Sequence, residues 1–453
     1  MKILLPDEWS AYQGEFIALW TDTDYAYALY EPGELIAVAL QDGFYPALPY
    51  PGADWFQRLA KDLQGHTAIG FEASDTAVEQ FRAPDGRAAW PDFTSPAGEG
   101  VHQLALGPVF GDITEPIHFR FFLMGERILK LQTRRGYAHR DILGLMQGKS
   151  ARQAARYAAR VSGDATVAHS IAFARAAEVA LGVEVPERAH FLRAVMAEIE
   201  RLANHCGDLA EIAKIAGSGL MESQFTILRE CLVAAADAAF GHRLMMDIVI
   251  PGGVAKDISG EGDAWLHEAL NRLQGELPNL REVFRGAMEE QVTGVGIVSE
   301  AFARAFNAGG FVGRGSGLAC DARVVPSYPP YQAFPINVPV EQAGDVAARI
   351  RVRLTEISES LGLVQNLLAA LPSGPLAVAL PVQTGAGLGV AESFRGPVWY
   401  WLKIENGHIQ AAFVADASAT HWKILEQAAC GLNLSDFQVL ERSISPSVAG
   451  GDL

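Results

Sequence analysis

The amino-acid sequence predicts an α+β protein with a mainly helical core, small antiparallel sheets and a short α+β module at the N-terminus. Apolar residues recur at helical spacing through residues 150–292 and again through residues 344–370. Apolar and polar residues alternate in residues 107–132, as in strands that are buried on one face. Near the N-terminus, two runs rich in strand-forming residues, 26–30 and 35–40, flank a turn signal.

The size and composition are those of an ordinary globular protein. The chain has 453 residues, enough for a large core and for two or more structural units. Its formal net charge of −17 argues against nucleic acid as a partner, because phosphate binding needs clustered lysine and arginine. The four cysteines are far apart and form no Cys-x-x-Cys pair, so this chain alone carries no obvious zinc or iron–sulfur motif. Isolated thiols also fit a reducing compartment.

The N-terminal residues suggest where the protein is found. Residues 1–9 lack the apolar core and the small-residue cleavage site of a signal peptide. The sequence has no run of about eighteen uncharged apolar residues that would span a membrane. We therefore expect a cytoplasmic protein, peripheral on the cytoplasmic face of the inner membrane.

Residues 1–100 are predicted to form the N-terminal module together with a linker. A helix is expected over residues 51–65, where a proline and a glycine bracket an apolar pattern. Residues 72–100 are rich in Asp, Pro, Gly and Ala, a composition that predicts the linker. The rest of the chain, residues 101–453, is predicted to form one large domain.

The large domain is expected to begin with a small sheet and to continue as helices. Strands are predicted within residues 107–121 and 125–132, and residues 136–142 are expected to close this sheet. A later hairpin is expected from residues 392–396 and the strand 398–404. The predicted helices cover residues 150–161, 188–215, 224–250, 265–288 and 344–370.

A glycine-rich loop at residues 313–323 has the composition of a phosphate cradle. It lacks the Gly-Lys-Ser/Thr ending, and no strand signal precedes it. Both observations argue against a phosphate-binding loop here.

Two stretches of the large domain carry the main functional signal. Residues 160–170 read Arg-Val-Ser-Gly-Asp-Ala-Thr-Val-Ala-His-Ser. They resemble the Arg-x-Cys-Gly-x-Cys-x-x-x-His-Ser signature of nickel–iron hydrogenase large subunits of the energy-converting type, such as formate hydrogenlyase and hydrogenase-4. Residues 445–450 resemble the second family motif, Asp-Pro-Cys-x-x-Cys. All four cysteines are replaced, and their positions hold Ser162, Ala165, Ser447 and Gly450.

The resemblance implies a metal site that has lost its ligands. In the family, four thiolates hold nickel, and two of them bridge to iron. A serine hydroxyl stays protonated near neutral pH and is a poor ligand for a soft metal, while alanine and glycine offer no side-chain donor. We therefore expect no nickel–iron centre and no cofactor in this chain. Because only residues 451–453 follow the second motif, we also do not expect the C-terminal extension that many metal-loaded members carry before maturation.

The resemblance extends over nearly the whole chain. The large domain is similar to the 49-kDa (D) subunit of respiratory complex I, which implies a helical bundle core. Residues 53–65 resemble a motif near the end of the 30-kDa subunit of complex I. This predicts a truncated docking module at the N-terminus, with an unrelated small domain as the alternative. Further family patterns are matched at residues 107–121, 136–142, 198–208, 313–323 and 392–396.

The resemblance also implies a cavity between this chain and an iron–sulfur partner. In hydrogenases this cavity holds the metal, and in complex I it binds the quinone headgroup. Glu115 matches a family glutamate that passes protons, with an ion pair to Arg120 or Arg140 as the alternative. His139 and Arg140 match a family pair, for which a satisfied polar network is favoured over contact with a substrate. His169 is expected to line the former metal pocket.

Three more residues are expected to line the pocket. Asp164 replaces an apolar residue of the signature, and a carboxylate in a dry cavity needs a partner such as Arg314, Arg323 or Arg395. Arg323 is itself a candidate for the pocket wall. Phe110 stands where quinone-binding relatives have a histidine. It cannot donate a hydrogen bond to a quinone carbonyl, but its ring can stack on the quinone.

These observations favour a subunit of a membrane-anchored complex related to energy-converting hydrogenases and complex I, without hydrogen chemistry. The pocket either serves another small acceptor, with a quinone as one candidate, or couples conformational change to ion pumping. The expected partners are a small iron–sulfur subunit with a four-iron cluster and membrane subunits that translocate ions. A non-catalytic scaffold is the main alternative, and a hydrogenase with a substitute metal is a third.

Overall fold

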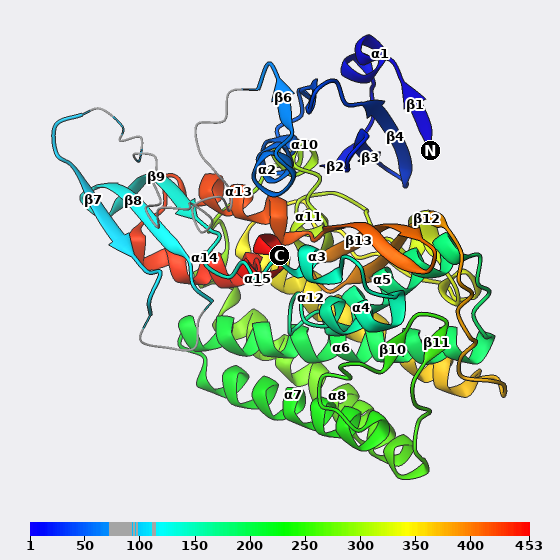
Figure 1. Ribbon diagram of the computed structural model, residues 1–453. Helices are drawn as coiled ribbons and strands as arrows, with labels where there is room; N and C mark the ends of the chain where they lie inside the picture. Colours follow the sequence, from blue (N-terminus) through cyan, green and yellow to red (C-terminus); the bar gives the residue numbers. More distant parts are fainter. Residues whose placement is uncertain (72–92, 94–95, 97, 111–114) are drawn as a thin grey trace.

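The structure is a computed structural model that describes residues 1–71, 93, 96, 98–110 and 115–453. Long helices form one side of the molecule, and the N-terminal sheet and a C-terminal sheet lie on the other (Figure 1). This is the predicted α+β class with a mainly helical core. Among the described residues, no helix has both the length and the apolar character needed to cross a lipid bilayer.

The N-terminal residues form the predicted α+β module. Its four-stranded sheet has the order β1-β4-β3-β2. The strands predicted at residues 26–30 and 35–40 and the helix predicted at residues 51–65 are confirmed. The linker predicted over residues 72–100 lies mostly outside the described residues. The elements are β1 (Lys2–Leu4), α1 (Pro6–Ala11), β2 (Phe16–Thr21), β3 (Tyr25–Tyr30), β4 (Glu34–Ala39), β5 (Phe44–Pro46), α2 (Ala53–Leu59), a π-helical turn (Ala60–Gln64) and β6 (Thr67–Ile69).

The large domain opens with a three-stranded antiparallel sheet. Its strands are β7 (Val101–Leu106), β8 (His118–Met124) and β9 (Arg127–Arg134). The strand predicted within residues 107–121 is found only at its end, where β8 begins, and the strand predicted within residues 125–132 is found as β9. The alternation did not predict β7, which precedes both. Residues 136–142 do not close the sheet, so that prediction is wrong. They turn instead, because the N–H groups of Gly136 and Ala138 donate to the Asp452 carboxylate rather than to a strand.

Long helices make up the core of the large domain. The helix predicted over residues 224–250 ends early, because Gly241 adopts φ 78° and terminates α7. The chain then forms the short strands β10 (Val249–Ile250) and β11 (Gly253–Val254). The other predicted helices are confirmed. The helices of this region are α3 (Ile142–Met146), α4 (Ala151–Ala158), α5 (Thr166–Leu181), α6 (Glu187–Ile215), α7 (Gly219–Phe240), α8 (Gly260–Ala287), α9 (Glu289–Val292), α10 (Glu300–Ala305), α11 (Gly310–Gly315) and α12 (Val346–Ala369).

The C-terminal part adds a second three-stranded sheet and three helices. The predicted hairpin is present as β12 and β13. The N-terminal module packs on this sheet, where Trp20 stacks on Phe413 with ring centroids 4.6 Å apart and Tyr27 lies 4.8 Å from Trp401. The elements are β12 (Gly385–Ser393), β13 (Gly396–Glu405), β14 (His408–Ala415), α13 (Ser418–Ala429), α14 (Phe437–Ile444) and α15 (Val448–Asp452), with short helical turns at Arg323–Ser327, Tyr331–Ala333 and Leu434–Asp436.

Glycines on β12 allow the strand to lie directly against α5. A Cβ atom at Gly387 would lie 2.1 Å from the carbonyl oxygen of Ala176, far inside van der Waals contact. Because side chains alternate along a strand, glycines at every second position leave one whole face open to the helix backbone. This contact fixes α5, which begins within the first motif. The facing residues are Gly385 with Ala180, Gly387 with Ala176, and Gly389 with Ala172.

Replacing Gly387 by alanine should lower the free energy of unfolding by about 3 kcal/mol, because the added methyl group overlaps the α5 backbone. The matched control is Gly362→Ala in α12, where an added Cβ meets no atom within 4 Å. Alanine there should stabilise the helix by about 0.5–1 kcal/mol. Urea unfolding followed by circular dichroism measures both effects. Equal midpoints for the two variants would contradict the close packing of α5 on β12.

Candidate functional site

The two degenerate motifs lie side by side, although they come from distant parts of the sequence. Ser162 lies in the turn between α4 and α5, and Ser447 precedes α15. Their Oγ atoms are 3.3 Å apart. Ser447 also caps α15, where its Oγ accepts a hydrogen bond from the Gly450 N–H at 3.0 Å. Ala165 is fully buried at the start of α5.

Asp164 pairs with Arg395, one of the three partners that the sequence suggested. The Arg395 guanidinium donates to one carboxylate oxygen, and the Ser162 hydroxyl donates to the other at 2.5 Å. Burial alone would raise the pKa of Asp164, but the Arg395 charge and these hydrogen bonds hold it below its usual range. The backbone of Gly310 packs directly against the backbone of Arg395. With φ 58°, a Cβ atom at Gly310 would lie 2.1 Å from the Arg395 carbonyl oxygen, so only glycine allows this contact.

Glu115 binds the start of α15 rather than an arginine. Its carboxylate accepts hydrogen bonds from the Ser447 hydroxyl at 3.2 Å and from the N–H groups of Val448 at 2.5 Å and Ala449 at 3.0 Å. The alternative ion pair with Arg120 or Arg140 is therefore not the arrangement found. The residue is exposed, so its carboxylate stays accessible while it holds the second motif.

His169 is fully buried behind the motifs. Its Nε2 lies 3.1 Å from Asp416 and its Nδ1 lies 3.1 Å from the Tyr400 hydroxyl. Burial would raise the pKa of Asp416, but the hydrogen bond from His169 holds it well below its usual range. A Cβ atom at Gly450 would lie 3.1 Å from the Asp416 carboxylate. His169 thus supports the second motif through Asp416.

His139 and Arg140 belong to a polar network, the interpretation favoured from the sequence. The His139 Nδ1 lies 2.7 Å from the Asp452 carbonyl oxygen. The Arg140 guanidinium donates to the carbonyl oxygens of Arg160 at 2.8 Å and Val161 at 2.6 Å. The pair therefore ties the C-terminal segment to the turn that carries the first motif.

Arg323 lies in a buried ion-pair network, not in the wall of the motif site as the sequence had suggested. It pairs with Asp321 at 2.7 Å and with Glu198 at 3.0 Å. These charges are sequestered from solvent between α6, α11, α12 and β12. Each needs an opposite charge close by, and that requirement draws Arg323 inward.

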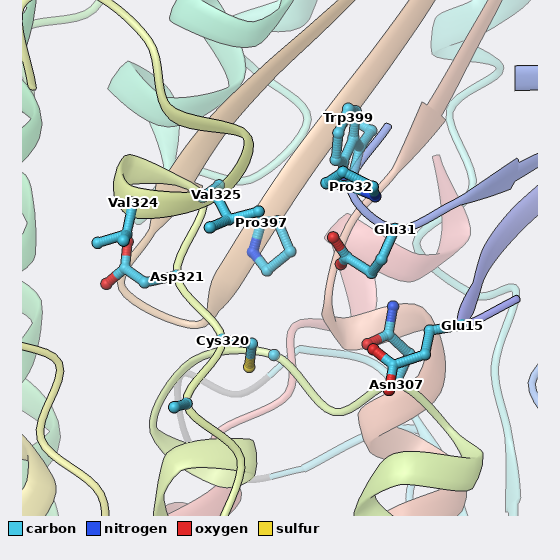
Figure 2. Close-up of a pocket in the computed structure, with 13 residues that line it drawn as sticks. Glu15, Glu31, Pro32, Asn307, Cys320, Asp321, Val324, Val325, Pro397 and Trp399 are labelled. Atoms are coloured by element: carbon cyan, nitrogen blue, oxygen red, sulfur yellow. The ribbon is translucent and has the colours of Figure 1, made fainter. Parts of the chain in front are cut away.

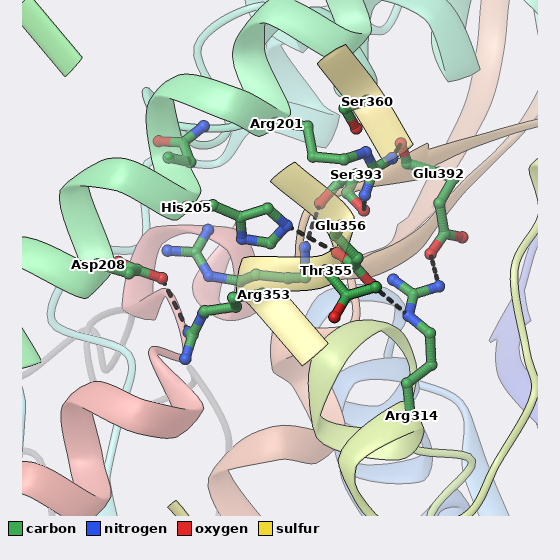
Figure 3. A network of polar contacts seen from close by, with 12 residues as sticks. Arg201, His205, Asp208, Arg314, Arg353, Thr355, Glu356, Ser360, Glu392 and Ser393 are labelled. Atoms are coloured by element: carbon green, nitrogen blue, oxygen red, sulfur yellow. Dashed lines mark hydrogen bonds and ion pairs between the residues drawn. The ribbon is translucent and has the colours of Figure 1, made fainter. Parts of the chain in front are cut away.

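The same network continues through α12 and α11. The Glu356 carboxylate lies between His205 at 2.7 Å and Arg314 at 2.6 Å (Figure 3). On the side of the motif site, Arg353 pairs with Asp208 at 2.9 Å. These residues cross-link three helices beneath the motif site.

A cavity of about 860 Å³, here called the main cavity, opens beside the two motifs. Phe110, Glu115, Asp164 and Arg395 line it. For Phe110 and Asp164 this is the predicted position. The remaining wall combines apolar and charged side chains, namely Leu106, Ile117, Phe119, Asp208, Glu211, Lys214, Ile215, Trp422, Phe437, Gln438, Glu441, Arg442, Ser445, Pro446 and Val448.

Another cavity, of about 520 Å³, lies between the N-terminal module and the large domain (Figure 2). Its wall includes Glu31, Asn307, Cys320 and Trp399, and burial raises the pKa of Glu31. None of the candidate residues from the two motifs lines this cavity. The main cavity is therefore the candidate site.

Comparison with known proteins places the chain in a family. Residues 140–207 match the family described as nickel-dependent hydrogenase, and residues 220–386 match the family described as respiratory-chain NADH dehydrogenase, 49 Kd subunit. The D component of the NADH-quinone oxidoreductase of Acidiphilium cryptum is 31% identical over 284 residues, which cover 61% of this chain and 69% of that protein. This chain belongs to the complex I 49-kDa and nickel–iron hydrogenase large-subunit family.

Other relatives come from the hydrogenase side of this family. Formate hydrogenlyase subunit 5 of Escherichia coli is 28% identical over 89% of this chain and 76% of that protein. Hydrogenase-4 component G of the same organism is 27% identical over 87% of this chain and 73% of that protein. A solved chain of an archaeal membrane-bound sulfane sulfur reductase shares the fold, with a TM-score of 0.73, 23% identity and coverage of 79% of this chain and all of that one.

The positions that hold cysteine ligands in hydrogenases do not fit a nickel–iron group in this member of the family. Two of the four, Ala165 and Gly450, have no donor atom in their side chains. The hydroxyls of Ser162 and Ser447 each donate to a carboxylate, and their oxygen atoms lie 3.3 Å apart. Among the described residues, no three His, Cys, Asp or Glu side chains gather in a group that could hold a metal ion.

Sequence reasoning missed several functional neighbours of the motifs. Tyr400 lies on β13, and Asp416 directly follows β14. Neither belongs to the two degenerate motifs, and only the fold brings them to His169. Asp452, which burial gives a raised pKa of about 6, anchors the turn before His139. The only signal for Asp452 in the sequence was that it closely follows Ser447.

Removing the Asp164 carboxylate should destabilise the protein, because Arg395 would be left charged and only 5% exposed. A fully buried pair would cost more, but the Asp164 side chain is 38% exposed, so we expect Asp164→Ala to cost about 1–3 kcal/mol. Adding Arg395→Met should recover part of this loss. Thermal unfolding of the single and double variants measures the coupling.

The control for this cycle is Glu230→Ala, which removes an exposed partner of Arg243 and should cost less than about 1 kcal/mol. If Asp164→Ala unfolds at the same temperature as this control, the ion pair does not hold the site together.

Proposed function

We propose that this chain is the acceptor-reducing subunit of a membrane-associated electron-transfer complex, and that its acceptor is a quinone. Its relatives are components of hydrogenases and of NADH-quinone oxidoreductases, which supports the complex. The solved chain of similar fold belongs to a sulfane sulfur reductase, so this fold serves more than one acceptor. Fold alone does not choose the acceptor, and the choice rests on the site.

The observation that carries the proposal is the set of residues at the cysteine positions. Ser162 and Ser447 face each other as hydrogen-bonding hydroxyls, where hydrogenases need soft thiolates. The charged pair Asp164–Arg395 lies directly beside them. A nickel–iron group would have to displace these hydrogen bonds and would gain no thiolate in return. Hydrogen chemistry is therefore absent from the proposed function.

The main cavity has the size and lining that a quinone headgroup needs. Its volume of about 860 Å³ lies within the usual range for small-molecule sites. Phe110 and Phe119 offer aromatic faces on which a flat ring can stack. Lys214 and Arg442 supply N–H donors for the two carbonyl oxygens, the role that a histidine at position 110 would otherwise share.

Electrons would reach this cavity from outside the chain. We propose a small iron–sulfur subunit with a four-iron cluster as the donor, docked over the cavity, and membrane subunits that couple the reaction to ion movement. The relative from Pyrococcus furiosus is named a membrane-bound hydrogenase subunit, and the solved neighbour belongs to a respiratory membrane complex. Both support an assembly at a membrane, and we propose the cytoplasmic face of that membrane for this chain.

The purified complex tests the proposal directly. It should contain less than about one-tenth of an equivalent of nickel, produce no hydrogen from reduced dye, and reduce a short-chain ubiquinone or menaquinone analogue. Phe110→Ala should raise the KM for the quinone about fivefold, because stacking of this ring is worth about 1 kcal/mol. Phe44→Ala, which alters an exposed ring of the N-terminal module, is the control and should leave KM unchanged.

Stoichiometric nickel together with hydrogen production would refute the proposal. Unchanged kcat and KM for the quinone in intact complexes carrying Glu115→Ala, Asp164→Asn and Phe110→Ala would instead identify the chain as a non-catalytic scaffold. Assembly is checked by size-exclusion chromatography, so that lost activity is not mistaken for lost structure.

A further inference from the structure

A smaller cavity shares Asp164 with the main cavity. Its volume is about 150 Å³, and Asp164 lines both cavities. Glu200 and Asn204 of α6, Arg229 of α7 and Arg243 also line the smaller one. The Arg243 side chain is 49% exposed, so this end of the cavity reaches the surface. Since one water occupies about 30 Å³ in the liquid, the smaller cavity can hold about five waters.

Glu200 is a buried acid at the inner wall of the smaller cavity. Its carboxylate accepts hydrogen bonds from the N–H groups of Val167 at 2.6 Å and Ala168 at 3.0 Å, at the start of α5. Burial raises its pKa to about 8, and the nearby Asp164 charge adds to that shift, against the opposing effect of these hydrogen bonds and of Arg201. At neutral pH the group therefore carries a proton that it can give up.

A chain of oxygen atoms joins Asp164 to Glu115, two residues of the main cavity wall, through two buried serines. The Asp164 carboxylate lies 2.5 Å from the Ser162 hydroxyl, which lies 3.3 Å from the Ser447 hydroxyl, which lies 3.2 Å from the Glu115 carboxylate. A hydrogen bond at each of these three oxygen–oxygen contacts would need three protons, but the Ser162 and Ser447 hydroxyls supply only two. While both carboxylates are ionised, the chain can accept one proton at one end and release one at the other.

We propose that the smaller cavity and this oxygen chain form a proton path, which carries protons from the surface near Arg243 through Glu200, Asp164 and the two serines to the main cavity. The path rests on the proposed quinone reduction, since that reaction consumes protons at the main cavity. Ser162 and Ser447 would then serve a new purpose at positions where hydrogenases bind metal.

The proton balance of the reaction fits this path. Reduction of a quinone to a quinol takes two electrons, supplied one at a time by the iron–sulfur partner, and two protons. Each proton leaves Glu200 and passes through water in the smaller cavity to Asp164. The Ser162 and Ser447 hydroxyls pass a proton on to Glu115, which gives it to a quinone oxygen in the main cavity, so that Asp164 and Glu115 return to their ionised forms. Solvent at the Arg243 end returns a proton to Glu200. Along the chain of oxygen atoms, only O–H bonds form and break.

Ser162→Ala tests the chain, because it removes the hydroxyl that joins Asp164 to Ser447. We expect kcat for quinone reduction to fall about tenfold or more, with KM unchanged and a larger solvent deuterium isotope effect. Ser162→Thr, which keeps a hydroxyl, should restore turnover. Ser170→Ala is the matched control, since that buried hydroxyl of α5 donates only to the Thr166 carbonyl.

The outcomes separate this inference from the proposed function. If the wild-type complex reduces quinone and Ser162→Ala has the same kcat and isotope effect, the proton path is wrong and the quinone site is retained. Absence of quinone reduction in the wild-type complex overturns both. Thermal unfolding of Ser162→Ala and Ser170→Ala shows whether either variant has lost its fold rather than its proton supply.

The pH profile tests the Glu200 end of the path. Because the acid form donates the proton, wild-type kcat should fall as the pH rises through about 8. Glu200→Gln should lower kcat at pH 7 and remove this decline. The charges that face Glu200 are Asp164, Arg201, Arg229 and Arg243, all unchanged in the variant.

Since Glu200 also binds the start of α5, a second variant tests the same end without touching that contact. Gly163 lines the smaller cavity, and a Cβ there meets no atom within 4 Å. Gly163→Leu should fill the cavity and lower kcat without changing KM. Full turnover in both Glu200→Gln and Gly163→Leu would refute the smaller cavity as the proton entrance.

Discussion

A buried ion-pair network is the constraint on which the rest of the structure depends. Arg314 has no exposed surface, and three carboxylates surround it, Asp321 at 2.9 Å, Glu356 at 2.6 Å and Glu392 at 3.2 Å. Removing these charges from water costs several kcal/mol each, and only close pairing offsets that cost. Because the partners lie on α12, on β12 and after α11, the charges are satisfied only when these elements take one arrangement.

The same network sets the geometry of the motif site. Burial and the neighbouring Asp321 charge raise the pKa of Glu392, against the attraction of Arg314, so this carboxylate depends on Arg314 to stay charged. Arg395 follows Glu392 by three residues in the β12–β13 turn, and it reaches Asp164 from there. A shift of the hairpin that disturbed Glu392 would also withdraw the arginine from the first motif. The framework and the site are therefore coupled through one short turn.

Much of the fold could be predicted from the sequence, and less of the site. Periodicity placed α6 and α12 closely, because long amphipathic patterns depend on nothing beyond the helix itself. The turn at residues 136–142 depends on Asp452, which is far away in the sequence, so local patterns misplaced it. The end of α7 depends on Gly241, a local signal that was outweighed by the apolar pattern continuing past it. Residue chemistry predicted a cationic partner for Asp164 but offered three. Only the fold could select Arg395, since that choice is a matter of distance.

The preserved framework and the altered centre follow different physical demands. Removing one partner from the network around Arg314 would leave a buried charge unpaired, at a cost of about 3–5 kcal/mol. The motif positions bear no such burden, because the Ser162 and Ser447 hydroxyls each donate to a carboxylate and lie 3.3 Å from each other. Two of these positions carry hydrogen-bonding hydroxyls in place of soft ligands, and Glu115 and His139 anchor the surrounding backbone. Asp164, Arg395 and the two hydroxyls therefore hold one another in fixed places through contacts between protein side chains alone.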